Sequence, residues 1–195
     1  MPENQIEKYF SSIAPNWDAM EDIPPERIEK LLDKLTIREG EHILDVACGT
    51  GIITGRLADR SKAKVLGVDI CGRMVEIARR KYEGNPRVEF MVADFVASDF
   101  KEEYDLVVIY NAFPHFMDVK ALEGALSRAL RKGGRFAILH SMSREALDDH
   151  HEFLPEGVSR CLESAEIEAR PFTDCFHILE SSESENHFCI IGKKI

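Results

Sequence analysis

The sequence lacks the features that mark secreted, membrane-spanning and nucleic-acid-binding proteins. It has no signal-like apolar stretch at its N-terminus, and no apolar run approaches the length of a membrane-spanning helix. Its five cysteines are odd in number and form no Cys-x-x-Cys pair, so we expect free thiols in a reduced, cytoplasmic protein. It has no basic stripe, and the net charge of −10 argues against a nucleic-acid partner, because phosphate binding depends on lysine and arginine. We also expect no integral membrane contact.

What the sequence does contain is the length and composition of one folded domain. Its 195 residues can bury a core of their own, and 44% hydrophobic with 31% charged residues is ordinary for a globular chain. No repeat, linker or low-complexity segment divides it. We therefore predict a single domain over residues 1–195.

Apolar strands alternate with helical patterns along most of the chain, which predicts a parallel sheet covered on both faces. The predicted strands are 42–47, 64–68, 88–92, 104–110 and 135–140, and the predicted helices are 3–13, one opening at Pro24–Pro25, 51–60, 72–82 and 119–131. Lys132-Gly133-Gly134 is expected to end the last of these helices with a left-handed cap.

The C-terminal part changes character. It predicts a helix over 158–169 and two strands, 172–179 and 187–191. The loop at 181–186 is too short for a crossover helix, so these two strands are expected to pair antiparallel.

The stretch from Ile43 to Gly51 is the most informative part of the chain. An apolar strand carries Asp45 and enters a glycine-containing turn through Ala47 and Gly49, after which a helical pattern begins. Glycine tolerates positive φ and lets a ligand approach the backbone, and a helix start offers unpaired N–H groups. A strand, a glycine turn and a helix in this order are typical of nucleotide-binding proteins.

The details of this turn separate the possible ligands. A dinucleotide-binding fold needs Gly-x-Gly-x-x-Gly, but Thr54 stands at the third position and Gly55 comes one residue late. The carboxylate of Asp45 would repel a pyrophosphate, whereas it suits a ligand that carries an ammonium and a sulfonium. The turn therefore favours S-adenosylmethionine over NAD.

From about Tyr9 to the C-terminus, the chain resembles the class I S-adenosylmethionine-dependent methyltransferases, in particular the small ubiquinone/menaquinone-methylase-like group. Leu44 to Gly51 resembles their first motif, with Ala47 where many members carry glycine. The resemblance implies an α/β fold: a Rossmann-like, doubly wound, seven-stranded sheet, mostly parallel with a C-terminal antiparallel hairpin strand. It also implies S-adenosyl-L-methionine as cofactor, and an N-terminal helical lid over 1–36 that precedes a core at 37–195.

Acidic residues at strand ends are candidate cofactor ligands. Asp69 follows the glycine turn by roughly 20 residues, the separation that places a carboxylate on ribose hydroxyls. By resemblance, Ile70 and Met74 would enclose the adenine, the Asp94 carboxylate would accept from the adenine amino group, and the Phe95 N–H would donate to the ring. An acid at a strand end also serves as a helix N-cap, worth about 1 kcal/mol, so each acid has a purely structural alternative. The expected cofactor-binding set is Asp45, Ala47, Gly49, Gly51, Asp69, Ile70, Met74, Asp94, Phe95 and Asn111.

Catalytic residues are harder to predict, because methyl transfer mainly requires that a nucleophile be held in line with the methyl carbon and that water be excluded. His115, in the loop after the fourth strand, is a candidate general base, since imidazole titrates near neutral pH; the alternative is a surface or capping histidine. His140, at the exit of the fifth strand, is another candidate or a buried histidine. The pair His150-His151 is a poor chelate, because adjacent helical residues point in different directions.

The loop after the fourth strand also bears on the acceptor. Methylases that act on amino groups of DNA bases carry Asn/Asp-Pro-Pro-Tyr/Phe at this point, whereas this chain has Asn111-Ala112-Phe113. A base-amine acceptor is therefore disfavoured.

The N-terminal segment is the expected lid. By resemblance, Tyr9 and Trp17 close the site, and Tyr9 is a further catalytic candidate. The alternative is that Trp17 only anchors this segment to the core.

The final hairpin carries a mirror pattern, Cys175-Phe176-His177 and His187-Phe188-Cys189. If His177 paired with His187, both Cys–His pairs would lie on one face and could bind zinc. The spacing lacks the short chelate loops of zinc sites, so we predict no metal and keep zinc as an alternative.

We expect methyl transfer by in-line displacement to a small-molecule acceptor, because the segment before the first strand leaves no room for a substrate domain; a homodimer is possible. One alternative is a non-catalytic S-adenosylmethionine-binding regulator. Another is an NAD(P)-binding oxidoreductase, which would need glycine at position 54 and a Tyr-x-x-x-Lys dyad that the chain lacks.

Overall fold

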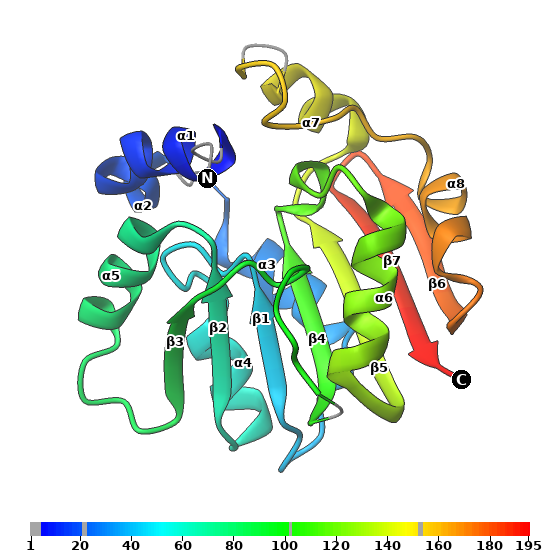
Figure 1. Cartoon of the computed structure of the whole chain (residues 1–195), viewed down its shortest axis with the longest axis horizontal. Helices are drawn as coiled ribbons and strands as arrows, with labels where there is room; N and C mark the ends of the chain where they lie inside the picture. Colours follow the sequence, from blue (N-terminus) through cyan, green and yellow to red (C-terminus); the bar gives the residue numbers. More distant parts are fainter. Residues whose placement is uncertain (1–4, 21–22, 102, 152–153) are drawn as a thin grey trace.

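A seven-stranded sheet forms the centre of the protein (Figure 1). The computed structural model describes residues 5–20, 23–101, 103–151 and 154–195, without the side chains of residues 150 and 151. The strands are β1 (Ile43–Val46), β2 (Val65–Asp69), β3 (Val88–Val92), β4 (Tyr104–Tyr110), β5 (Leu130–His140), β6 (Phe176–Ser184) and β7 (His187–Lys194). Their order is β3-β2-β1-β4-β5-β7-β6, and β7 runs in the opposite direction to the other strands of this sheet. The predicted mostly parallel sheet with a C-terminal antiparallel hairpin is confirmed.

Helices cover both faces of this sheet (Figure 1). One face packs against α3 (Pro25–Asp33), α4 (Thr54–Ser61) and α5 (Gly72–Lys81), and the other packs against α6 (Val119–Ala129) and α8 (Ala165–Ala169). Strand β4 shows why the central strands read as continuous apolar runs, because successive side chains enter opposite layers. Leu106 and Val108 pack into one layer, while Val107 and Ile109 pack into the other.

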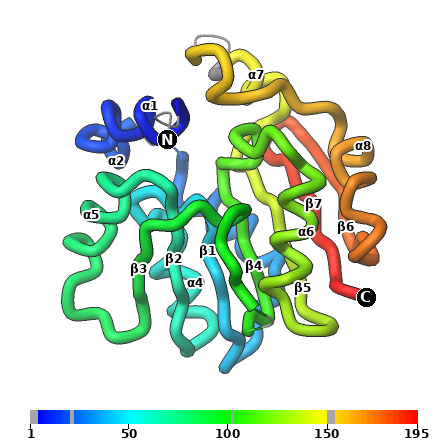
Figure 2. Tube along the Cα trace, viewed as in Figure 1, coloured from blue at the N-terminus to red at the C-terminus, as the bar shows by residue number. Residues whose placement is uncertain are grey.

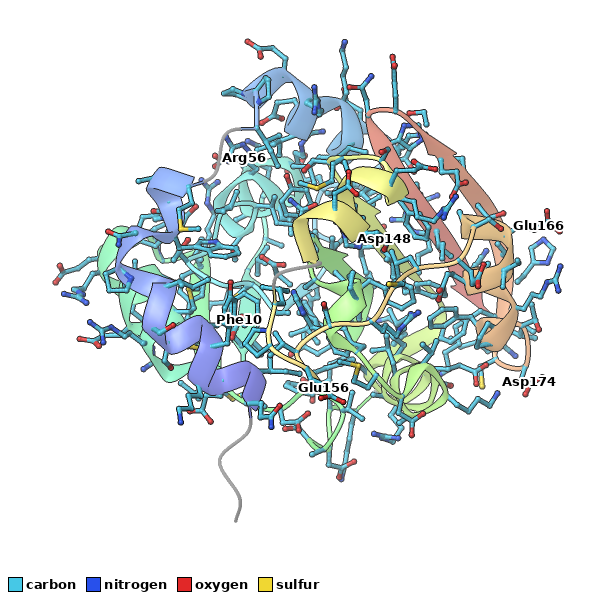
Figure 3. The ribbon with its side chains drawn as sticks, turned by 90° about the horizontal axis from the view of Figure 1, so that it is seen from above. Phe10, Arg56, Asp148, Glu156, Glu166 and Asp174 are labelled. Carbon is cyan, nitrogen blue, oxygen red and sulfur yellow. The ribbon has the colours of Figure 1, made fainter. Side chains whose placement is uncertain are left out.

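Three short helices lie beyond the carboxyl ends of the central strands, at the top of Figures 1 and 2. They are α1 (Gln5–Ile13), α2 (Trp17–Met20) and α7 (Arg144–His151). A 3-10 turn at Ala14–Asn16 joins α1 to α2, and we call residues 5–20 the N-terminal arm. In Figure 3, which looks down on this end, Phe10 of α1 points toward the middle of the molecule, with α7 across from it.

The connection from α6 to β5 differs from the prediction. The helix ends at Ala129, and Leu130 is already extended (φ −80°, ψ 137°), so no left-handed glycine cap ends it. Instead, β5 advances from Leu130 to Arg135 while β4 advances only from Tyr104 to Leu106, which makes a bulge at the start of β5. Gly133, at φ +75°, allows this bulge.

The predicted helix over 158–169 is also wrong in its first half. Only Ala165–Ala169 is helical before a 3-10 turn at Arg170–Phe172. The Arg160 N–H donates to the Pro114 carbonyl (3.0 Å), so this segment pairs with the loop after β4 instead of with itself. A sequence period cannot report such a competing long-range hydrogen bond.

The hairpin is longer than predicted. Strand β6 continues to Ser184, and only Glu185 and Asn186 form the turn, because the polar residues assigned to a loop lie on an exposed edge strand. His177 pairs with Lys193, and His187 pairs with Ser184, so the register that would align the two Cys–His pairs does not occur. In the described ranges, no group of three or more His, Cys, Asp or Glu residues could hold a metal ion.

No helix within the described ranges is long and apolar enough to cross a membrane.

Candidate functional site

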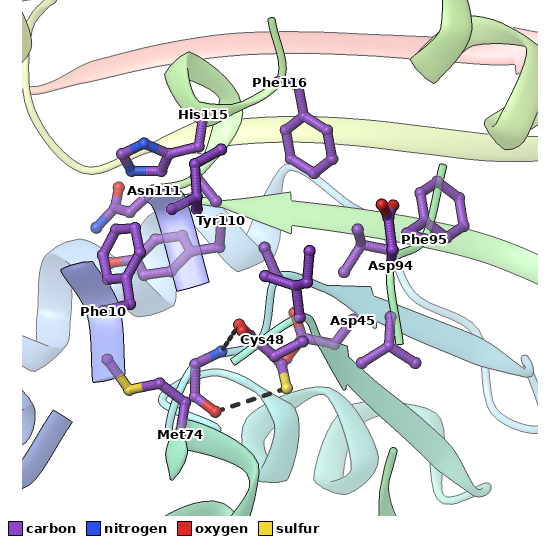
Figure 4. Close-up of a pocket in the computed structure, with 18 of the residues that line it drawn as sticks. Phe10, Asp45, Cys48, Met74, Asp94, Phe95, Tyr110, Asn111, His115 and Phe116 are labelled. Carbon is purple, nitrogen blue, oxygen red and sulfur yellow. Dashed lines mark hydrogen bonds between the residues drawn. The ribbon is translucent and has the colours of Figure 1, made fainter. Parts of the chain in front are cut away.

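A cavity of about 310 Å³ lies at the carboxyl ends of β1, β2 and β4, beneath the N-terminal arm (Figure 4). Crevices outside the carboxyl ends of strands are where open α/β sheets bind ligands. Most of its wall is apolar or aromatic, and a few polar groups converge on it. This combination is typical of small-molecule sites.

The glycine turn after β1 forms the floor of the cavity. Ala47 (φ +55°) and Gly49 (φ +54°) both take left-handed backbone conformations and line it. A Cβ added at Gly49 would lie 3.7 Å from Nε1 of Trp17, so the indole of the arm covers this part of the turn. Gly51 (φ +81°) does not line the cavity. A Cβ there would lie 2.9 Å from the ring of Phe90, so the lack of a side chain at Gly51 lets this ring pack against the backbone of the turn.

Asp45 lies in β1 with its side chain 1% exposed. Its Oδ2 accepts a hydrogen bond from the Thr54 hydroxyl (2.6 Å), whereas its buried Oδ1 accepts none from the described residues. Burial raises the pKa of Asp45 to about 7, and the nearby Asp69 carboxylate acts in the same direction. A buried carboxylate oxygen without a donor is costly, so this atom is suited to a ligand that brings an ammonium group.

Asp69, at the end of β2, is held in place by two backbone groups. The Gly49 N–H donates to Oδ2 and the Cys71 N–H to Oδ1, both at 2.8 Å; the first of these is dashed in Figure 4. Burial raises the pKa of Asp69, and the two N–H donors partly oppose that shift. The carboxylate faces the cavity with fixed orientation, and Ile70 and Met74 line the wall beside it.

Asp94 and Phe95, after β3, also line the cavity. Asp94 is exposed, and its Oδ1 accepts from the N–H groups of Val96 (3.0 Å) and Ala97 (3.2 Å). These two bonds close a turn over residues 95–98 and no helix begins there, so Asp94 is not the helix N-cap of the structural alternative. A contact with adenine stays a prediction. Phe95 is 4% exposed and closes the wall behind it.

Asn111 ties together the loops after β4 and β5. It lies in a left-handed conformation (φ +51°), and its Nδ2 donates to Ser141 Oγ (2.9 Å). The Ser141 N–H donates back to its Oδ1 (2.9 Å), and Asn111 lines the cavity.

The catalytic candidates fall in different places. His115 lines the cavity, and its ring meets Phe10 edge-on at 4.9 Å between centroids. Its Nδ1 lies 2.8 Å from the Val158 carbonyl. A carbonyl can only accept, so Nδ1 is the donor of this hydrogen bond. His140 is buried against Phe188 (5.8 Å between centroids) and does not line the cavity.

Tyr9 does not line the cavity either. It packs edge-on against Phe10 (5.3 Å), and Phe10 enters the wall with Ile6 and Trp17. The sequence predicted Tyr9 at the site, but the residue that lines the cavity is Phe10, its neighbour on the helix. The spacing of Ile6, Phe10 and Ile13 is the signal that could have found it, because these positions share one helical face.

The arm is fastened to the glycine turn. Thr50 donates its hydroxyl hydrogen to Asp18 Oδ1 (2.5 Å), and Lys81 of α5 pairs with Asp18 Oδ2 (2.5 Å). Ser11 Oγ lies 3.2 Å from the Cys71 thiol, in a second polar contact. The arm is therefore linked at two points to the elements that carry the cofactor candidates.

The charge of the cavity wall has one sign. Asp45, Asp69, Asp94 and Asp118 line the cavity, and no described lysine or arginine does. Such a wall suits a cationic ligand and opposes a pyrophosphate. The predicted cofactor residues come together here, apart from Gly51. The pair His150-His151 falls among side chains outside the described part of the structure.

Residues 43–134 match a family model described as a methyltransferase domain. A demethylmenaquinone methyltransferase from Thermus thermophilus is 35% identical over 140 residues, which cover 67% of this chain and 63% of that protein. The chain spans 47%, 53% and 63% of the length of three curated relatives, which are longer proteins.

Two solved structures share the fold along nearly the whole chain. A Haloferax volcanii methyltransferase, solved with the methyltransferase activator Trm112, has a TM-score of 0.81 at 20% identity and covers 95% of this chain and 97% of its own. The N-methyltransferase NodS of Bradyrhizobium japonicum, solved with S-adenosylhomocysteine, has a TM-score of 0.76 at 17% identity, with 98% and 99% covered. At these identities the likeness establishes the fold, a Rossmann-like methyltransferase sheet.

Proposed function

This chain carries a methyltransferase domain of the S-adenosylmethionine-dependent kind, and from that premise we propose that it moves the methyl group of S-adenosyl-L-methionine to a small-molecule acceptor by in-line displacement. The observation that carries the proposal is the cavity wall with four carboxylates and no described lysine or arginine. The cofactor supplies an activated methyl group on a sulfonium.

The residues present fit this cofactor. The buried Asp45 Oδ1, which accepts no hydrogen bond from the described residues, would take its ammonium group. The fixed carboxylate of Asp69 would hold the ribose, and Asp94 with Phe95 would hold the adenine. A dinucleotide would instead bring its pyrophosphate against these acids, which argues against the NAD(P) alternative.

The chain's own side chains would then exclude water and handle the proton. Phe10 and Trp17 of the arm cover the cavity, so the reacting groups are removed from bulk solvent. His115 is the best-placed candidate base, because it is the one catalytic candidate among the described residues that lines the cavity, and the Val158 carbonyl fixes its ring through Nδ1. The cofactor-binding residues, the single domain, the cytoplasmic location and a homodimer stay predictions.

Titration calorimetry tests the cofactor. We expect micromolar binding of S-adenosylmethionine and S-adenosylhomocysteine, and no binding of NADH at the same concentrations. If NADH binds and neither S-adenosylmethionine nor S-adenosylhomocysteine does, the proposal is overturned and the oxidoreductase alternative is favoured.

A turnover assay separates an enzyme from a non-catalytic regulator. The expected result is release of S-adenosylhomocysteine that depends on an added small-molecule acceptor. Tight cofactor binding with no product from a broad panel of amines, phenols, thiols and carboxylic acids would favour the regulator.

A further inference from the structure

The part of the cavity that the cofactor candidates leave over is lined by a separate set of side chains. We call it the acceptor side: Phe10 from the arm, and His115, Phe116, Met117 and Asp118 from the loop after β4. In Figure 4, His115 and Phe116 lie along the top of the view and Met74 lies at the bottom. The cofactor side is formed by Asp45, Ala47, Gly49, Asp69, Ile70, Met74, Asp94 and Phe95.

The acceptor side is apolar and aromatic, with a negative rim. Phe10 and His115 present rings, and Met117, 44% exposed, lies at the mouth. Asp118 follows it and accepts the Ala121 N–H through Oδ1 (2.8 Å), as the N-cap of α6. These walls suit a flat apolar molecule and offer an anion no charged partner.

The nearby basic side chains are paired and do not line the cavity. Arg160 lies closest to the acceptor side, since its Nε donates to the Phe116 carbonyl (3.2 Å), but its two terminal nitrogens pair with both carboxylate oxygens of Glu168 (2.7 and 2.8 Å). Arg27 donates to the Ser141 carbonyl. Lys81 pairs with Asp18. None of these lines the cavity, and the residues outside the described ranges include no lysine or arginine.

The proposed cofactor does not reverse this charge. Its ammonium, sulfonium and carboxylate sum to one positive charge, which faces the carboxylates of Asp45 and Asp69. Asp94 and Asp118, both exposed, still add negative charge to the wall. An acceptor with a carboxylate or phosphate would lose its hydration there and gain no cation in return.

We propose that the acceptor side selects an apolar, ring-containing acceptor with no negative charge on the part that enters the cavity. This inference rests on the proposed function, because it assigns the remaining space to the methyl acceptor. It excludes carboxylate and phosphate groups from the vicinity of the transferred methyl.

Three phenols of one shape test the proposal: 4-ethylphenol is uncharged, tyramine is cationic, and 4-hydroxyphenylacetate is anionic. Their dissociation constants are measured by ligand-observed NMR on the protein saturated with S-adenosylhomocysteine, and again on the protein alone. We expect the anionic phenol to bind at least tenfold more weakly than the uncharged one in both states. Equal binding of the two, or no binding of any phenol, would overturn the proposal.

A charge substitution at the mouth provides the decisive variant. Met117→Lys adds a cation beside the acceptor space and is expected to reduce the preference for 4-ethylphenol over the anion at least tenfold. Met91→Lys is the matched control, because Met91 is 36% exposed on β3 and does not line the cavity; its preference should equal that of the wild type. An unchanged ratio in a folded Met117→Lys protein would overturn the proposal.

Asp118→Asn covers the case in which the lysine variant does not fold. Asparagine is as good an N-cap as aspartate, so α6 keeps its cap while the rim loses one negative charge. We expect the discrimination against the anion to fall about threefold, and no change would count against the proposal. If S-adenosylhomocysteine does not bind at all, the proposed function fails, whereas the charge preference is still decided by the phenols on the protein alone.

Discussion

The cofactor side and the acceptor side of one cavity are built by different means. On the cofactor side, Asp69 is fixed by the N–H groups of Gly49 and Cys71, which belong to the ends of adjacent strands. On the acceptor side, His115 is held by the carbonyl of Val158, 43 residues along the chain, and by the ring of Phe10.

This difference has a consequence for how each side responds to change. The cofactor side is held by hydrogen bonds at the carboxyl ends of β1 and β2. Loss of the Asp69 carboxylate would remove the acceptor of both bonds, and no other described side chain accepts them. The acceptor side depends on two separate segments, the arm and residues 158–160, that dock onto the loop after β4. We therefore expect a large loss of cofactor affinity when a hydrogen-bonded anchor of the cofactor side is removed, and a smaller loss of ligand affinity when the arm is loosened.

The largest expected effect comes from Asp69→Ala, which breaks the cofactor side. The change removes the carboxylate predicted for the ribose and leaves the Gly49 and Cys71 N–H groups without their acceptor. We expect the dissociation constant of S-adenosylhomocysteine to rise about 100-fold, equivalent to about 2.7 kcal/mol, as measured by calorimetry.

Asp99→Ala is the control for that variant, because Asp99 is an exposed acid that pairs only with Lys101 among its described ion-pair partners. It should bind as the wild type does. Normal affinity in a folded Asp69→Ala protein would contradict the assigned role.

The second expected effect is a dependence of cofactor affinity on pH, which arises from Asp45 on the cofactor side. Because the pKa of Asp45 is raised to about 7, the stability it contributes is present below about pH 4 and is lost as pH rises through 7. A bound ammonium requires the ionised form, so wild-type affinity for S-adenosylhomocysteine should rise about tenfold between pH 6 and pH 8.

Asp45→Asn should remove both trends while keeping an acceptor for the Thr54 hydroxyl. Calorimetry should show a flat affinity across this range. In urea unfolding without ligand, the free energy of unfolding of the variant should increase relative to that of the wild type as pH rises from 5 to 7.5. A wild-type slope retained in the variant would place the titrating group elsewhere.

A smaller effect is expected from Asp18→Ala, which loosens the arm and leaves the cofactor side intact. The change removes the partner of the buried Thr50 hydroxyl and of the partly exposed Lys81. Because Asp18 is itself partly exposed, the affinity should fall about fivefold or less, near 1 kcal/mol. The off-rate of S-adenosylhomocysteine in surface plasmon resonance should increase by a similar factor.

Asp59→Ala removes a comparable exposed ion pair, with Arg87, at a distance from the arm, and should leave the off-rate unchanged. Equal off-rates in both variants would show that the Asp18 contacts do not retain the ligand.

The smallest effect is expected from Ala47→Gly. Ala47 occupies a left-handed conformation (φ +55°), which costs a non-glycine residue about 1–2 kcal/mol. Glycine relieves that strain but loses about 0.5–1 kcal/mol to chain entropy, so thermal unfolding should show a gain in the free energy of unfolding of no more than about 1.5 kcal/mol. A clear loss of stability would mean that the methyl group of Ala47 makes contacts worth more than its strain.

The two sides also differ in how well the sequence predicted them. The strand-end acids and the glycine turn could be placed because each follows from a local pattern, an apolar strand followed by an acid or a glycine. Phe10 was missed because a choice between adjacent residues of α1 depends on the rotation of the helix against the sheet. Residues 158–164 were predicted as helix, since no local signal reports that Arg160 bonds to the Pro114 carbonyl.

The hairpin gives the same lesson at larger scale. Antiparallel pairing could be predicted from the short connection, but the register could not, because β6 is an edge strand with many polar residues. The zinc alternative depended on that register. It lost its basis when His177 was found opposite Lys193.

Trp17 is the only tryptophan in the chain, and its indole lies over Gly49 with the ring of Phe10 5.6 Å away, centroid to centroid. Any change in indole emission from this protein therefore reports on the contact between the arm and the glycine turn. The chain has an intrinsic fluorophore beside its cavity. A change in this emission on binding of S-adenosylhomocysteine would therefore test the predicted lid in the unmodified chain, with no dye attached.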